Sequence, residues 1–257
     1  MGLTCLCNPW NGLNIITHQI KPAMFTSSCF QTRFVLLIAA LAFTAPVSSF
    51  GQSFSLGADM VSRYVWRGVD FGESFSIQPT LEFGAGDLAI GSWASYSISA
   101  NGAGANEHDL YFSYSLGPVS IGMTDYYFPS PGGTPFFDYS DGGAHFLEIN
   151  ASAGGTDDFP LTISGNIFVH NDDDNSVYIE LGYPFTVEDV DLGVSVGVVP
   201  QESAFYGTGA FGITVLGLSA SKEIQITESF SLPVFVSYIV NPTPDVERSF
   251  LVFGFSL

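Results

Sequence analysis

Residues 54–67, with the sequence FSLGADMVSRYVWR, alternate between apolar and polar side chains. Successive side chains of a β-strand point to opposite faces, so as a strand this segment has one apolar face and one face of charge, serine and glycine. The apolar face ends in Tyr64 and Trp66, residue types that favour a membrane–water boundary. The segment therefore predicts a half-apolar strand, and repetition along the whole chain would predict a closed transmembrane barrel.

The alternation does repeat, in segments of about ten residues, the length that a tilted membrane-crossing strand needs. It is clearest at 190–198, where every second residue is Val or Leu. In the segment 210–226 the alternation slips around residues 216–218, which predicts a β-bulge there. We predict about twelve strands, at residues 54–67, 75–85, 88–98, 107–116, 119–128, 145–152, 161–170, 176–185, 190–198, 210–226, 232–240 and 248–257.

The connections between these segments also alternate in kind. Gly86-Asp87 and Gly117-Pro118 form minimal turns, whereas 129–143 is long and rich in Pro, Gly and Asp. Outer-membrane barrels have short periplasmic turns and longer outer loops. We therefore expect an all-β fold, a single antiparallel transmembrane β-barrel in the bacterial outer membrane, in contact with its lipid.

The N-terminal segment reads as an export signal. An apolar run at 34–43 follows Arg33 and precedes the small residues 44–49, which is the pattern of a secretory signal peptide. We expect residues 1–51 to be a cleaved signal peptide with an upstream extension, and residues 52–257 to be the barrel. All three cysteines (Cys5, Cys7 and Cys29) precede the cleavage site, so the mature barrel needs no disulfide or cysteine metal site.

The mature chain is strongly acidic. Lys21 and Arg33, two of the six basic residues, leave with the signal peptide while all 25 acidic residues remain, so the net charge is about −21. Phosphate recognition needs Lys and Arg, so this balance argues against nucleic acid as a partner. Acidic loops that keep an exported protein soluble would explain the same charge.

The polar faces of the strands carry most of the functional interest. A charged side chain that faced hydrocarbon would cost a few kcal/mol, so we expect these residues to line one lumen. Excess carboxylates would favour cations in a water-filled passage, whereas in a filled interior the arginines would only neutralise neighbouring acids. The candidate lumen residues are Asp59, Arg63, Arg67, Glu82, Glu107, Asp109, Glu148, Glu180 and Asp191.

Two enzyme-like strings lack the structural context that their chemistry requires. Residues 193–197 fit G-x-S-x-G but lie inside an unbroken strand alternation, and residues 207–212 fit G-x-G-x-x-G without a following helix. His108, His145 and His170 lie on different segments and are expected to be polar residues at a barrel rim. Asp172, Asp173 and Asp174 could hold calcium but lack EF-hand spacing. We expect no enzyme, cofactor or metal site.

Several motifs resemble one family. The strings SRYVWRG (62–68), IQPTLEF (77–83), GSWASYS (91–97), EHDLYFSYSLG (107–117) and DYYFP (125–129) resemble the porin family called TorF or Gcw_chp. The resemblance covers essentially the mature chain and implies an outer-membrane barrel. It implies no catalytic residues and no particular solute.

The sequence thus favours an outer-membrane porin through which small hydrophilic solutes or cations diffuse passively. One alternative is a barrel-embedded enzyme that modifies lipid or lipopolysaccharide, with Ser113 or Ser115 near His108 as the thin basis for it. Another is a non-conducting structural or adhesion barrel that uses the 129–143 loop. The oligomeric state stays open.

Overall fold

The computed structural model describes residues 51–99, 104–129, 133–156, 158–243 and 248–257. The expected signal peptide, apart from Gly51, lies outside these ranges. Within them, no helix is long and apolar enough to cross a membrane.

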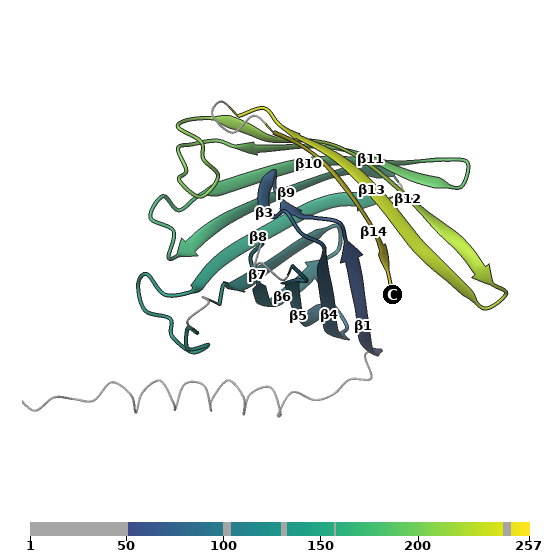
Figure 1. Ribbon diagram of the computed structural model, residues 1–257, viewed down its shortest axis with the longest axis horizontal. Coiled ribbons are helices and arrows are strands. Elements are labelled where there is room, and N and C mark those ends of the chain that lie inside the picture. The colour runs from purple at the N-terminus through teal and green to yellow at the C-terminus, as the bar shows by residue number, and fades with distance from the viewer. Residues whose placement is uncertain (1–50, 100–103, 130–132, 157, 244–247) are drawn as a thin grey trace, which may run out of the picture. The chain divides into compact units, whose positions relative to one another are not determined.

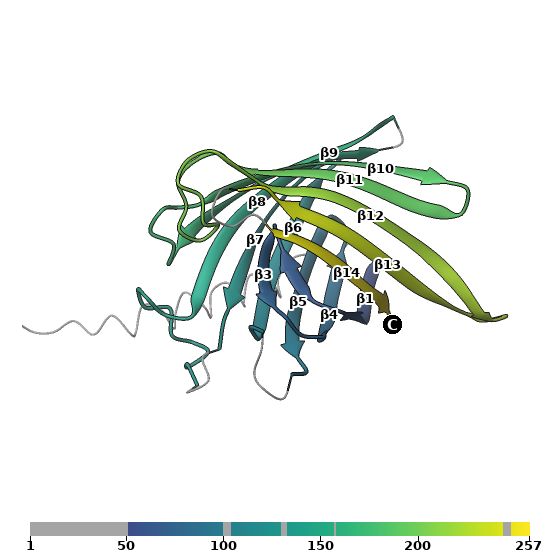
Figure 2. The same cartoon turned by 45° about the horizontal axis from the view of Figure 1, so that its top comes forward.

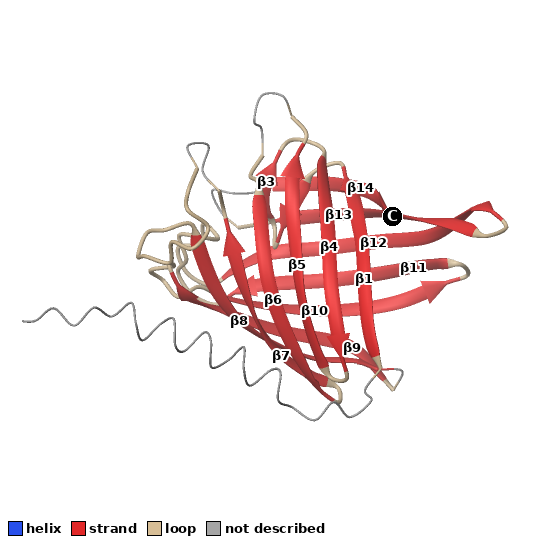
Figure 3. Ribbon diagram, turned by 90° about the horizontal axis from the view of Figure 1, so that it is seen from below, coloured by secondary structure: helices blue, strands red, loops and turns tan. Residues whose placement is uncertain are grey.

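Twelve antiparallel strands form a closed barrel, which confirms the predicted fold class (Figures 1 and 3). Each strand pairs with its neighbour in the sequence, and β1 pairs with β14 to close the ring. Two further short strands form a separate sheet, β2 (Tyr64–Trp66) and β3 (Val69–Gly72). The barrel strands are β1 (Gln52–Val61), β4 (Ser76–Ala85), β5 (Leu88–Ser97), β6 (Glu107–Leu116), β7 (Val119–Tyr127), β8 (His145–Thr156), β9 (Phe159–His170), β10 (Val177–Val187), β11 (Val190–Val199), β12 (Gly212–Thr227), β13 (Phe230–Asn241) and β14 (Arg248–Ser256).

The apolar register of the strands faces outward. Large apolar side chains on this face are well exposed, such as Leu56 at 74% and Phe112 at 46%. A water-soluble fold rarely leaves so much contiguous apolar surface uncovered, and an acyl-chain environment removes that penalty. Every barrel strand contributes to this outer face, so it encircles the barrel.

The two ends of the barrel differ. We call the end with residues 62–75, 98–99, 104–106, 128–129, 133–144, 171–176, 200–211 and 242–243 the loop end, and the opposite end the turn end. The turn end carries the tight connections after β4, β6, β8, β10 and β12, together with residues 51 and 257. Gly86 (φ 62°) and Gly117 (φ 65°) supply the left-handed backbone that such hairpin turns require. Figure 1 shows the long connections on one side and the β10–β11 and β12–β13 turns on the other.

The seam between the first and last strands is short. β1 and β14 pair over Asp59–Ser256, Met60–Phe255 and Val61–Gly254, and Ala58 and Leu257 exchange two backbone hydrogen bonds of 3.1 and 3.0 Å. The alternating C-terminal segment therefore completes the barrel wall.

Two sequence predictions are wrong in detail. The first strand does not run from 54 to 67 but ends at Val61, and the following residues form the β2–β3 hairpin instead. The predicted slip at 216–218 occurs a few residues earlier, because Gly197 pairs with Val215 and Val198 with Ile213, which leaves Thr214 as the extra residue. Both departures lie at the loop end and serve the same internal contact.

Candidate lumen and its internal hairpin

The β2–β3 hairpin, which we call the lumen hairpin (residues 63–74), folds inside the ring of strands rather than away from it (Figures 1 and 2). Val61 and Ser76, at the ends of β1 and β4, are register partners, so the hairpin is an insertion into what could be a short turn. Arg67 (φ 50°) and Gly68 (φ 80°) form its tip with two consecutive left-handed residues. Arg63 braces its base by donating hydrogen bonds of 3.0 and 2.7 Å to Asp70.

The tip rests against the opposite wall of the barrel. A Cβ on Gly68 would lie 1.9 Å from the carbonyl oxygen of Thr214, the bulge residue of β12. Asn241 at the end of β13 donates a 3.0 Å hydrogen bond to the Gly68 carbonyl. Only glycine fits this position, both for its backbone conformation and for the closeness of the neighbouring strand.

Arg67 joins the hairpin to a second part of the wall. Its guanidinium donates to both carboxylate oxygens of Glu148 on β8, at 2.5 and 2.9 Å, and to the Tyr206 hydroxyl at 2.8 Å. The Tyr126 hydroxyl donates to the same carboxylate at 3.1 Å. Burial lowers the pKa of Arg67, but the bonds to Glu148 outweigh that effect and hold it above its ordinary value. Arg67 therefore stays charged and neutralises a buried carboxylate.

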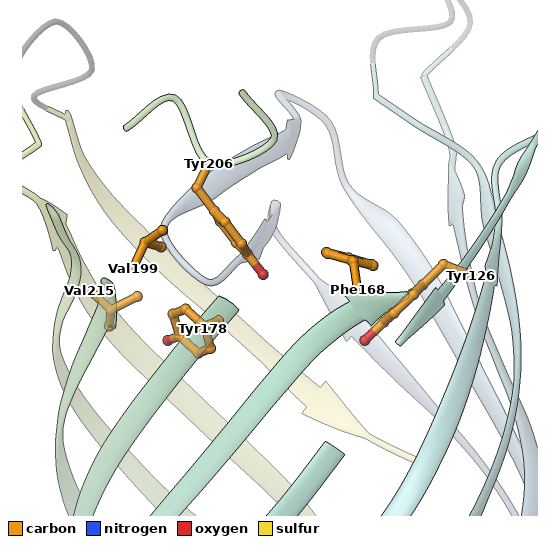
Figure 4. Close-up of a cluster of buried hydrophobic side chains, with 6 residues drawn as sticks. All are labelled: Tyr126, Phe168, Tyr178, Val199, Tyr206 and Val215. Carbon is orange, nitrogen blue, oxygen red and sulfur yellow. The ribbon is translucent and has the colours of Figure 1, made fainter. Parts of the chain in front are cut away.

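Aromatic side chains fill the space around this ion pair. The guanidinium lies over the rings of Trp66 and Tyr178, with centroids 4.1 and 4.6 Å away. Trp66 also contacts the rings of Phe205 and Tyr206 from the 200–211 connection. Burial raises the pKa of the Tyr206 hydroxyl to about 12. Figure 4 shows the buried cluster inside the ring of strands, formed by Tyr126, Phe168, Tyr178, Val199, Tyr206 and Val215.

The turn-end half of the interior is built differently. Its wall carries small and polar residues, and a cavity of about 390 Å³ opens beside them. Glu180 faces this cavity and accepts a hydrogen bond from the Tyr178 hydroxyl. The small inward residues of the cavity wall are Thr162, Gly182, Gly193, Ser195, Gly217, Ser219 and Ser237.

The predicted lumen residues divide between these two halves. Glu107 and Asp109 on β6 and Glu148 on β8 are deeply buried in the loop-end half. Arg63 and Arg67 are not on a barrel strand at all; the hairpin carries them.

The other four predicted residues lie toward the turn end or near the seam. Glu82 on β4 accepts a 2.9 Å hydrogen bond from the Tyr111 hydroxyl, and Asp59 on β1 lies beside Gln78 in register. Asp191 sits next to the 188–189 turn, where Thr186 donates to it at 2.9 Å. Glu180, on β10, faces the cavity as described above.

Sequence reasoning missed a polar network on the outer side of the wall. Asp125 on β7 and His145 on β8 belong to the outward register, yet His145 is completely buried because the 133–143 segment folds over it. The ring nitrogens of His145 face the Asp125 carboxylate at 2.8 Å and the Phe136 carbonyl at 2.5 Å. Tyr139 donates to Asp125 at 2.6 Å. An Asp in an otherwise apolar register is the signal that could have revealed this network.

The histidines do not form a shared site. His108 faces outward and contacts Ser92 at 3.0 Å, whereas Ser113 belongs to the inward register, so the suggested Ser113–His108 pairing is wrong. Across the described ranges, no group of three or more His, Cys, Asp or Glu side chains is arranged to hold a metal ion.

Comparison with known proteins gives a structural likeness and a family match. The solved structure of the KdgM porin superposes with a TM-score of 0.45 at 10% sequence identity, covering 78% of this chain and 97% of that chain. No curated protein sequence matches. A family model described as "Bacterial protein of unknown function (Gcw_chp)" matches residues 45–231, which is more than half of the chain. The chain therefore belongs to the Gcw_chp family.

Proposed function

We propose that this protein is an outer-membrane channel through which small hydrophilic solutes diffuse, with a preference for cations. One observation carries the proposal: a closed barrel presents apolar side chains outward on every strand and, in its turn-end half, polar or small side chains inward. Such a wall separates lipid from a polar interior, which is what a passive channel needs. The proposed residence is the outer membrane, reached by way of the N-terminal signal.

The proposed cation preference rests on the charges inside. The inward residues Asp59, Glu82 and Glu180 have no arginine or lysine partner in the described part of the chain. Rings of carboxylates concentrate cations and repel anions near a passage. The two arginines of the lumen hairpin, Arg63 and Arg67, are already bound to Asp70 and Glu148.

The lumen hairpin is the proposed restriction of this passage. It crosses the loop-end half and packs against β8 and β12, so solute flow depends on how firmly Arg67 and Gly68 hold it. In the resting protein we expect small conductance, limited at the Arg67–Glu148 layer rather than in the cavity below it.

Single-channel recording of the mature protein in planar bilayers tests the proposal. We expect discrete steps and, in a salt gradient, a reversal potential of the sign for cation selectivity. Combined neutralisation by Glu82→Gln and Glu180→Gln should shift the reversal potential toward zero without abolishing the steps. A folded protein that gives no steps even without its hairpin would rule out the channel.

A specific contact favours a second candidate, a lipid-directed hydrolase. Ser92 and His108 lie 3.0 Å apart on the outward face, where an acyl ester could reach them. The nearest outward carboxylate, Asp125, already binds His145 and Tyr139, so no acid orients His108. Release of fatty acid from phospholipid vesicles that Ser92→Ala abolishes would establish this activity; none is expected.

A further inference from the structure

Two inward carboxylates on β6 have no positive partner. Glu107 is 2% exposed and Asp109 is 5% exposed. They occupy positions i and i+2 of one strand, so both face the interior about 6.7 Å apart along the backbone.

Each carboxyl group also keeps one oxygen without a hydrogen-bond partner. These atoms, Glu107 Oε2 and Asp109 Oδ1, are buried and unpaired among the described residues. Buried polar atoms nearly always have a partner, so two unpaired carboxylate oxygens on the same side of one strand point to an occupant. Two bare carboxylates at this distance would also repel each other strongly in a low-dielectric interior.

The basic side chains of the barrel do not supply that occupant. Arg63 binds Asp70, Arg67 binds Glu148 and Lys222 binds Asp189, and within the described ranges neither these residues nor Arg248 form an ion pair with Glu107 or Asp109. The neutralising charge must come from outside the chain, as a proton or as a cation.

The surroundings favour a cation. Tyr64 of the lumen hairpin borders this place, because its ring packs 5.5 Å from that of Trp93, the register partner of Asp109. The other inward carboxylates and the acidic chain raise the cation concentration around the interior. Hard oxygen ligands with two negative charges suit a divalent ion, and calcium tolerates irregular geometry with water completing its shell.

We propose that Glu107 and Asp109 bind one divalent cation of the calcium type between the barrel wall and the lumen hairpin. Tyr64 is the hairpin's contact at this site, so the bound ion ties the hairpin to β6 as Arg67 ties it to β8. The site itself stands apart from conduction, but its effect on solute flow rests on the proposed channel function.

The tryptophans of the mature chain provide a fluorescence signal for calcium binding. After removal of the signal peptide, Trp66 and Trp93 are its two tryptophans. Trp93 pairs in register with Asp109, and its ring centroid lies 5.5 Å from that of Tyr64. Calcium binding should therefore change the intrinsic fluorescence of the folded protein in detergent micelles, and Trp93→Phe should remove most of that change.

Direct binding is measured by equilibrium dialysis with radioactive calcium at neutral pH, followed by the same titration with magnesium. We expect one tightly held calcium ion per chain, weaker magnesium binding, and a higher thermal midpoint with calcium than with chelator. The variants Glu107→Gln and Asp109→Asn, singly and together, should each weaken binding by about tenfold or more. A single variant that folds is enough for the test.

Two controls separate this site from other acids. Glu82→Gln changes an inward carboxylate that Tyr111 already satisfies, and Asp173→Asn with Asp174→Asn changes the acidic 171–175 connection. Binding that survives Glu107→Gln but disappears in the loop variant overturns the proposal. So does the absence of calcium binding at neutral pH, which would assign a shared proton to the pair.

The two proposals fail separately. Calcium binding that depends on Glu107 in a protein that never conducts would retain the cation site and reject the channel. Conductance in a protein that binds no calcium would retain the channel and reject the cation site. When both hold, chelator should raise the conductance of the wild type and leave that of the double variant unchanged.

Discussion

The two halves of the barrel interior are built on opposite plans. The loop-end half is packed with aromatic rings, an Arg67–Glu148 ion pair and buried carboxyl groups, and many of its inward side chains are almost fully buried. The turn-end half carries glycine, serine and threonine around an open cavity. The outer surface, by contrast, is mainly apolar along both halves, apart from the polar residues around Asp125 and His108.

The barrel wall and its plug are therefore separate parts of one chain. The plug consists of the lumen hairpin and the 200–211 connection. Twelve strands enclose a space that side chains alone can either fill or leave open. Small residues leave it open in the turn-end half, whereas an inserted hairpin and the 200–211 connection fill it at the loop end. If so, the plug can be altered without dismantling the wall.

Removing the hairpin should have the largest effect. Because Val61 and Ser76 are register partners, Gly-Asn-Gly in place of residues 63–75 leaves a short connection that can join β1 to β4. We expect the barrel to fold and its single-channel conductance to rise several-fold. Replacing residues 134–141 with the same three residues shortens a segment that lies outside the wall, and conductance should stay near the wild-type value. Equal increases in both variants would contradict the assignment of the hairpin as the plug.

The Arg67 ion pair should dominate the stability of the packed half. The Arg67 side chain is 12% exposed and that of Glu148 is 1% exposed, so Arg67→Gln leaves a buried charge without its partner. We expect a loss of about 3–5 kcal/mol in unfolding free energy, measured by urea titration in lipid vesicles.

Arg63→Gln is the matched comparison for that variant. The Arg63 side chain is 30% exposed and its partners Asp70 and Glu73 are 9% and 77% exposed, so the loss should be smaller, about 1–2 kcal/mol. If the two arginine variants proved equally stable, the loop-end half would not be held by its buried charge.

The same contrast explains what the sequence could and could not predict. The wall follows from period-two alternation, because lipid on one side and a polar interior on the other impose the pattern on every strand. At 190–198 that pattern alone predicted both the strand and its inward residues. The even strand count and the alternation of tight and long connections followed from the same rule.

The plug could not be predicted in this way. Tyr64 and Trp66 continue the alternation of β1, so the alternation alone gave no sign that the chain turns inward after Val61. The signal was the Arg67-Gly68 pair, which suits a tight turn, but Arg67 is an uncommon residue for a left-handed conformation. Contacts such as that of Arg67 with Glu148 join residues far apart in the sequence, and only the closed barrel brings them together.

A smaller effect should separate two glycines with the same backbone strain. Gly68→Ala and Gly117→Ala both place a side chain at positive φ, which costs about 1–2 kcal/mol. At Gly117 the new Cβ meets nothing within 4 Å, whereas at Gly68 it meets the Thr214 carbonyl at 1.9 Å. We expect Gly68→Ala to lose about 1–3 kcal/mol more than Gly117→Ala in the same unfolding measurement. Equal losses would mean that the hairpin tip moves aside freely.

The smallest effect on the channel should come from the open half. Residues 52–257 contain no cysteine, so Ser195→Cys in the cavity wall and Ser95→Cys in the packed half provide single labelling sites in a protein that starts at residue 52. A charged thiol reagent should modify Cys at 195 rapidly and Cys at 95, where the native serine is fully buried, very slowly. Because the cavity is wider than the plug, the label at 195 should lower conductance only slightly in the wild-type background.

After hairpin removal the same label should cause a larger fractional drop in conductance, since the cavity then limits flow. Labelling at 95 should also become fast. If neither change appeared, the resistance to flow would not lie in the loop-end half.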